Sequence, residues 1–148
     1  MLPLAGPVES VAMSDEQFMR RALELARHAQ SEGEVPIGAV VVLDGQIVGE
    51  GWNRPIGSSD PTWHAEIHAM RSAAAAVKNY RLSNSILYVT LEPCDMCVGA
   101  MFHARIDRVV FGATDPKKQV LKNNVKIEGG VLAQECGSIL SKFFAAKR

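Results

Sequence analysis

The stretch TLEPCDMCVGAM, Thr90 to Met101, contains two cysteines three positions apart, Cys94 and Cys97, directly after a proline. Residues i and i+3 are neighbours on one face of a helix, and the first turn of a helix favours the thiolate form of a cysteine. Taken alone, the pair is compatible with a disulfide, a redox pair, part of a zinc site or two buried core thiols. The choice between these alternatives depends on whether another residue of the chain could share a site with the two thiols.

The number of cysteines and the expected order of helices and strands argue against two of these alternatives, the disulfide and the redox pair. The chain has three cysteines in 148 residues, the third being Cys136. A closed zinc site built from two CxxC pairs would need one more, and an odd, sparse set does not indicate a secreted disulfide framework. A thioredoxin-like redox pair is expected within a different order of helices and strands. Cys136 lies on an apolar helix face, so we expect it in the core.

The partner of the two thiols lies about thirty residues upstream, in the segment DPTWHAEI, which contains His64 and Glu66. One imidazole and two thiolates form a ligand set that suits zinc. Three protein ligands leave the fourth tetrahedral position open, which is typical of a catalytic rather than a structural zinc. We therefore predict one Zn²⁺ per chain, bound by His64, Cys94 and Cys97.

Glu66 fits this chemistry as a base rather than as a ligand. Two thiolates already neutralise the formal charge of Zn²⁺, so a carboxylate beside the metal would help by accepting a proton from water. Residues i and i+2 point about 200° apart on a regular helix. His64 and Glu66 can therefore converge only if the metal lies beyond the N-terminal end of the helix, or if that turn is irregular.

Together the two segments form H-x-E followed by P-C-x-x-C, the signature of zinc-dependent nucleobase deaminases. Several stretches resemble the bacterial tRNA-specific adenosine deaminases: EGWNRPIG (50–57), DPTWHAEI (60–67), NYRL (79–82), LYVTLEPCDMC (87–97) and RVVFGATD (108–115). The resemblance covers about 14–115 and resumes at EGGVLAQECGSILSKFF (128–144).

The resemblance implies a cytidine-deaminase-like fold, a homodimer, and conversion of the wobble adenosine of a tRNA anticodon to inosine. It also implies that His64, Cys94 and Cys97 bind zinc. Glu66 would shuttle protons from the attacking water to N1 and to the leaving amino group, and Asn53 would contact the flipped nucleoside.

Two features depart from the family pattern. Trp63 stands where a small residue is expected, so its ring must either pack against the protein or crowd the pocket. The segment DPKKQVLKNNVKIEGG (115–130) replaces a longer, glycine-rich stretch. This segment is short by nature or by engineering, or it is incomplete in the given sequence. Its basic residues suit a solvated loop as well as a phosphate-binding surface; they are Lys117, Lys118, Lys122 and Lys126.

The pattern of elements predicts a three-layer α/β/α domain over residues 14–148, with a mixed sheet of about five strands. Helices are predicted at 14–32, 61–77, 94–103 and 131–146, and strands at 37–43, 46–53, 86–90, 108–112 and 125–128. Asp44-Gly45 predicts a hairpin turn, and residues 54–61 a loop. The nearly all-apolar run at 37–43 predicts a strand buried on both faces. Ser14 and Gln17 predict a capping box at the start of the first helix. Asp60 is the predicted cap of the second helix, with Pro61 at its first position.

Composition sets wider limits. Sixteen basic and sixteen acidic residues cancel, so net charge gives no support to nucleic-acid binding, which must rest on a local patch. Residues 1–13 resemble neither a signal peptide nor a packed segment, and we expect a disordered leader there. No apolar run reaches the length of a membrane span. These features predict a cytoplasmic protein with no membrane partner.

Three rival functions remain open at this point. The same zinc machinery serves cytosine, cytidine and guanine deaminases. An engineered or variant deaminase could act on adenine or cytosine in single-stranded DNA. A catalytically silent domain could keep zinc for structure alone, although such a site does not need Glu66.

Overall fold

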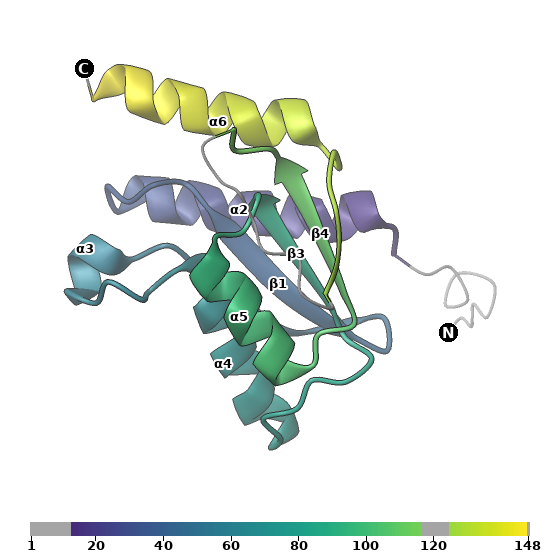
Figure 1. The fold of residues 1–148 in the computed structure, drawn as a ribbon. Coiled ribbons are helices and arrows are strands. Elements are labelled where there is room, and N and C mark those ends of the chain that lie inside the picture. Colours follow the sequence, from purple (N-terminus) through teal and green to yellow (C-terminus); the bar gives the residue numbers. More distant parts are fainter. Residues whose placement is uncertain (1–12, 117–124, 148) are drawn as a thin grey trace, which may run out of the picture.

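The computed structural model describes residues 13–116 and 125–147 (Figure 1). The predicted leader, apart from Met13, lies outside the described residues. So do three of the four clustered lysines, Lys117, Lys118 and Lys122, and therefore most of the departure from the family pattern after Asp115.

A mixed five-stranded sheet forms the middle layer, in the order β2-β1-β3-β4-β5. The strands are β1 (Gly38–Leu43), β2 (Gln46–Trp52), β3 (Ile86–Leu91), β4 (Arg108–Ala113) and β5 (Lys126–Glu128). β1 is antiparallel to both β2 and β3, whereas β3, β4 and β5 are parallel. The predicted mixed sheet is confirmed.

The hairpin between β1 and β2 turns where it was predicted to turn. Asp44 and Gly45 have φ angles of 52° and 76°, the left-handed backbone that a tight two-residue turn requires. The apolar run of β1 is buried on both faces of the sheet, as its unbroken hydrophobicity predicted.

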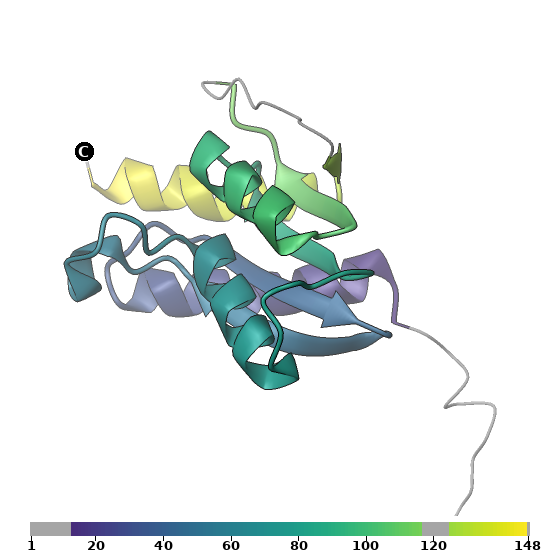
Figure 2. The ribbon, with the colours of Figure 1, turned by 60° about the horizontal axis from the view of Figure 1, so that its bottom comes forward.

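Two layers of helices cover the sheet (Figures 1 and 2). One face packs against α2 (Asp15–Ser31) and α6 (Ala133–Ala146), and the other against α4 (Ala65–Val77) and α5 (Asp95–Ala104). Each face has its own apolar core. The predicted three-layer α/β/α architecture is therefore confirmed. In the part of the chain that the structure describes, no helix is long and apolar enough to cross a membrane.

Helix α2 begins at the predicted capping box. The Ser14 hydroxyl accepts a hydrogen bond from the backbone N–H of Gln17 (3.2 Å), and the Gln17 side chain accepts one from the backbone N–H of Ser14 (2.7 Å). Two otherwise unsatisfied N–H groups are thereby paired, which fixes the start of the helix.

The predicted start of the next long helix was wrong. Helix α4 begins at Ala65, not Pro61. The Asp60 carboxylate accepts hydrogen bonds from the backbone N–H (2.9 Å) and hydroxyl (2.7 Å) of Thr62, so it closes a local turn instead of capping a helix. The predicted loop upstream contains a four-residue helix, α3 (Pro55–Ser58).

Glycines in β2 allow α4 to lie directly on the sheet. A Cβ atom at Gly51 would lie 2.2 Å from the carbonyl oxygen of Ala65 and 2.6 Å from the backbone nitrogen of Ala69. Because no side chain intervenes, the first turn of α4 is fixed against the last residues of β2. This contact sets the position of everything that the start of α4 carries.

Candidate active site

The candidate site lies where two helices begin at the same edge of the sheet. β2 and β3 run in the same direction, since each is antiparallel to the β1 strand between them. Helix α4 follows β2, and α5 follows β3. His64 and Cys94, both in extended backbone, are the N-caps of these helices. The partial positive charge of two helix N-termini therefore acts on this point, which favours thiolates.

The structure brings the three predicted zinc ligands together. Nδ1 of His64 lies 3.5 Å from Sγ of Cys94 and 3.5 Å from Sγ of Cys97. All three ligand atoms lie within 4.8 Å of one another. A tetrahedral zinc, with bonds of about 2.0–2.1 Å to nitrogen and about 2.3 Å to sulfur, would hold nitrogen and sulfur about 3.6 Å apart. The donor atoms thus fit zinc in both type and spacing.

The two thiols differ in their electrostatic environment. The hydrogen bond from Cys97 lowers the pKa of Cys94 to about 3. The same hydrogen bond, together with burial and the negative charge of Glu66, raises the pKa of Cys97. Zinc would be held by both sulfurs as thiolates, so its binding releases any thiol proton that remains.

Glu66 lies beside this pair, in the first turn of α4, with only 4% of its surface exposed. Nδ1 of His64 lies 3.5 Å from Sγ of Cys97, and the negative charge of Glu66 helps to raise the pKa of the same thiol. The condition set by helix geometry is met because His64 precedes the helix and Glu66 lies within it. A buried carboxylate next to a metal site is well placed to act as a general base.

Asn53 connects the end of β2 to the start of α4. It is 6% exposed, and its Oδ1 accepts a hydrogen bond from the backbone N–H of Ala65 (3.0 Å). Sequence reasoning proposed only a substrate contact and missed this structural role. Among the residues that the structure describes, the amide N–H₂ group of Asn53 forms no hydrogen bond.

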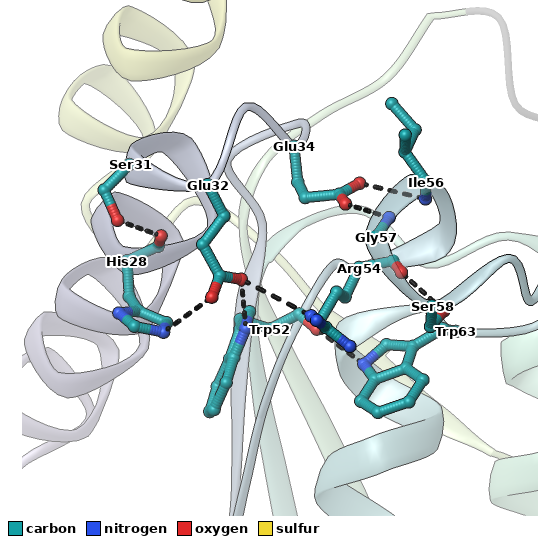
Figure 3. A network of polar contacts seen from close by, with 10 residues as sticks. All are labelled: His28, Ser31, Glu32, Glu34, Trp52, Arg54, Ile56, Gly57, Ser58 and Trp63. Carbon is teal, nitrogen blue, oxygen red and sulfur yellow. Dashed lines mark hydrogen bonds and ion pairs between the residues drawn. The ribbon is translucent and has the colours of Figure 1, made fainter.

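Trp63 packs against the protein (Figure 3). Its ring stacks on His68, with centroids 3.4 Å apart and planes at 12°, and its Nε1 donates to the carbonyl oxygen of Trp52 (3.2 Å). Burial lowers the pKa of His68, so a neutral imidazole makes this stack near neutral pH. Of the two alternatives for Trp63, packing is the one observed.

Two carboxylates that sequence reasoning did not single out hold the loops around the site. Glu34, 2% exposed, accepts hydrogen bonds from the backbone N–H groups of Ile56 (3.2 Å) and Gly57 (2.7 Å), as Figure 3 shows. Glu92 accepts one from the backbone N–H of Asp115 (2.9 Å). A lone acidic residue gives no sequence signal for such a role, because its partners are backbone groups.

The comparisons with known proteins agree with this geometry. Residues 12–113 match the family described as the cytidine and deoxycytidylate deaminase zinc-binding region. The chain belongs to the cytidine and deoxycytidylate deaminase family. The matched region includes all three predicted ligands, and with their spacing it supports a zinc site.

Individual relatives of this deaminase have names that are more specific than that of the family. The tRNA-specific adenosine deaminase of Haemophilus influenzae is 51% identical over 90% of this chain and 85% of its own length. A structure solved in work on A-to-I editing by tRNA:A34 deaminases is 40% identical, with a TM-score of 0.77, and the match covers 83% of this chain and 98% of that one. A guanine deaminase from Bacillus subtilis is 43% identical, with a TM-score of 0.66, but the match covers only 69% and 66% of the two chains.

Proposed function

We propose that residues 14–148 form one zinc-dependent deaminase domain, which hydrolyses adenosine to inosine at the wobble position of a tRNA anticodon. The observation that carries the reaction type is the convergence of a His/Cys/Cys ligand set and a buried carboxylate at two helix starts. The substrate assignment rests on the relatives named tRNA-specific adenosine deaminase, with which the match extends over most of both chains.

In this proposal His64, Cys94 and Cys97 hold one zinc ion per chain. Bound zinc supplies a Lewis acid that makes water nucleophilic near neutral pH. Glu66 accepts the two protons of the water that attacks C6 of adenine one after the other. It delivers the first to N1 and the second to the amino group, which leaves as ammonia. Asn53 directs its amide N–H₂ group to the nucleoside, because Ala65 already holds its Oδ1.

Guanine deamination is the strongest rival, because the guanine deaminase match has a similar identity over a shorter length. A silent zinc domain is disfavoured by Glu66, since a structural site has no use for a buried carboxylate beside its ligands. Product analysis on free guanine and on three oligonucleotides tests these alternatives: an anticodon stem-loop, single-stranded DNA containing adenine, and single-stranded DNA containing cytosine. Inosine from the stem-loop supports the proposal, whereas xanthine from guanine alone, or uracil from the third strand alone, contradicts it.

The short segment after Asp115 bears on substrate choice. Recognition of a folded tRNA needs contacts spread over a wide surface, and flipping the base costs a few kcal/mol that those contacts offset. With this segment shortened, we expect a weaker preference for the stem-loop over an unstructured strand than the family shows. A variant with a restored loop tests this: a strong preference that restoration does not increase would contradict the expectation.

We also propose that the chain forms a homodimer through the surface between α4 and α5. A cavity of about 390 Å³ lies there, lined mainly by apolar side chains that include Met70, Tyr80 and Leu82. Tyr80 is 68% exposed. A second copy would cover these side chains, and sedimentation of the purified protein tests this.

The three unpaired cysteines suit a reducing, cytoplasmic compartment.

A further inference from the structure

Arg54 places a cation at the rim of the candidate active site. It directly follows Asn53, and its backbone N–H donates to the carbonyl oxygen of Trp63 (3.2 Å), the residue before His64. Arg54 is therefore joined to both segments that carry proposed site residues. A nucleotide held by Asn53 would bring its flanking phosphates close to this side chain.

The guanidinium of Arg54 is held in place from two sides (Figure 3). Its central carbon lies 5.6 Å from the ring centroid of Trp63, within the range of a cation–π contact. Its Nε lies 3.8 Å from Oε1 of Glu32. That carboxylate also accepts a hydrogen bond from Nε1 of Trp52 (3.1 Å) and lies 3.5 Å from Nε2 of His28. Glu32 is thus shared among three groups and restrains Arg54 only loosely.

The hydrogen-bond donors of the Arg54 guanidinium are not used by the described part of the chain. Arg21 and Arg108 each bind a carboxylate with two nitrogens, at 2.6 and 2.9 Å from Glu50 and at 3.1 and 2.7 Å from Asp15. The guanidinium of Arg54 forms no hydrogen bond with the described residues, and 38% of its side chain is exposed. It is oriented by an aromatic ring, yet its donors remain available.

We propose that Arg54 binds a backbone phosphate next to the reacting nucleotide, an assignment that rests on the proposed function. A guanidinium presents a planar fork of N–H donors that matches the oxygens of a phosphate. The central carbon of the guanidinium lies over the ring of Trp63, and Nε lies near Glu32. The two terminal nitrogens are therefore left to bind the phosphate. Trp63 thereby has a use at this position: it orients the arginine.

The test measures how binding depends on salt. An anticodon stem-loop is bound to the zinc-loaded Glu66→Ala protein, so that turnover does not interfere, with and without Arg54→Gln. Loss of one phosphate contact should weaken binding and reduce the slope of log K against log salt by about 0.7. Arg54→Lys keeps the charge and should keep the slope.

Arg105→Gln is the matched control. Arg105 is exposed, lies 5.4 Å from the ring of Phe102, and follows α5 at the end opposite to Cys94. This variant removes the same charge and a similar aromatic contact, so its slope should equal that of the parent. A slope change of equal size in both variants would overturn the proposal, because it would reflect net charge alone.

A second arm identifies the ligand. Neutral methylphosphonate linkages on either side of the target adenosine should weaken binding to the parent and to Arg105→Gln, but cause a smaller loss in Arg54→Gln. An equal loss in all three proteins would overturn the assignment. Inosine formation by wild-type protein is measured on the unmodified stem-loop. If the wild-type protein forms no inosine but Arg54→Gln still shows the smaller methylphosphonate loss, the proposed function is contradicted and the role of Arg54 is not. If the wild-type protein forms inosine but Arg54→Gln has the salt slope of the parent, the role of Arg54 is contradicted and the proposed function is not.

Discussion

Nδ1 of His64 lies 3.5 Å from Sγ of Cys94, and each of these residues is the N-cap of a different helix. The two helices follow strands that run in the same direction on either side of β1, so both begin at one edge of the sheet. The ligand set is thus assembled by topology from segments about thirty residues apart. The backbone of both His64 and Cys94 is extended, which lets each side chain turn away from the helix that follows it.

Zinc content should depend on the His64–Cys94–Cys97 set and not on cysteine in general. Purified wild-type protein should contain one zinc per chain, and Cys94→Ala should lose most of it, since two protein ligands bind the ion weakly. Cys136 is buried on the opposite face of the sheet and serves as the control. Metal analysis of Cys136→Ala should give the wild-type content. Equal zinc in Cys94→Ala and wild type would contradict the ligand assignment.

Asn53 combines a structural and a proposed substrate role, and two variants separate them. Asn53→Asp keeps an oxygen that can accept the Ala65 N–H but loses the amide donors, whereas Asn53→Ala loses both. An unpaired buried partner costs roughly 1–3 kcal/mol, so each variant should lower kcat/KM on the best oligonucleotide by about tenfold or more. Only Asn53→Ala should also lower the thermal unfolding midpoint. An unchanged kcat/KM in Asn53→Asp would refute the substrate role.

The contact of β2 with α4 should link stability to the metal site. In Gly51→Ala the new methyl group meets backbone atoms of α4 at 2.2 and 2.6 Å, so the helix has to shift. We expect a loss of about 1–3 kcal/mol in the free energy of unfolding, together with weaker zinc binding. At Gly137 in α6 the nearest atom would lie 3.8 Å away, so Gly137→Ala should not destabilise the protein. Denaturant unfolding with zinc titration measures both; full stability of Gly51→Ala would show that the contact is not tight.

Asp15 should make stability depend on pH. Hydrogen bonds from Arg108 hold the pKa of Asp15 below its usual range. Because the folded pKa is lowered, this stabilisation is fully present above the unfolded pKa of about 3.9 and is lost as pH falls through the folded pKa. The side chain is 37% exposed, so solvent screening limits the effect to about 0.5–1 kcal/mol.

Unfolding curves across pH check this expectation. Asp15→Asn should be less stable than wild type at pH 7. The difference should shrink as pH falls through the lowered folded pKa of Asp15, because wild-type Asp15 is then also neutral. Asp107→Asn removes an exposed carboxylate from the turn before β4 and provides the comparison. A stability difference for Asp15→Asn that stays constant with pH would contradict the ionic origin of the effect.

Most of the fold follows from local patterns. The apolar runs of β1, β3 and β4, the Asp44-Gly45 turn and the capping box at Ser14 each depend on residues close together in sequence, and all are confirmed. The three ligands could be predicted because zinc limits the choice of donor atoms. Their role in this chain stays a proposal.

The errors and omissions arise where a local signal has two outcomes. Asp60-Pro61 can cap a helix or close a turn, and the bonds to Thr62 select the turn, so the start of α4 could not be predicted. Glu34 bonds to backbone groups more than twenty residues away. The environment of Trp63 depends on His68 in α4 and on Arg54, whose positions relative to Trp63 follow only from the folded structure.

The central claim is that a carboxylate beside a three-ligand zinc site moves protons for deamination. Single-turnover deamination of an anticodon stem-loop by wild type and Glu66→Ala, with zinc measured in the same samples, tests it most directly. We predict that wild type forms inosine, and that Glu66→Ala keeps its zinc and loses at least about 10²–10⁴-fold in rate. A near-normal rate in zinc-loaded Glu66→Ala would contradict the account.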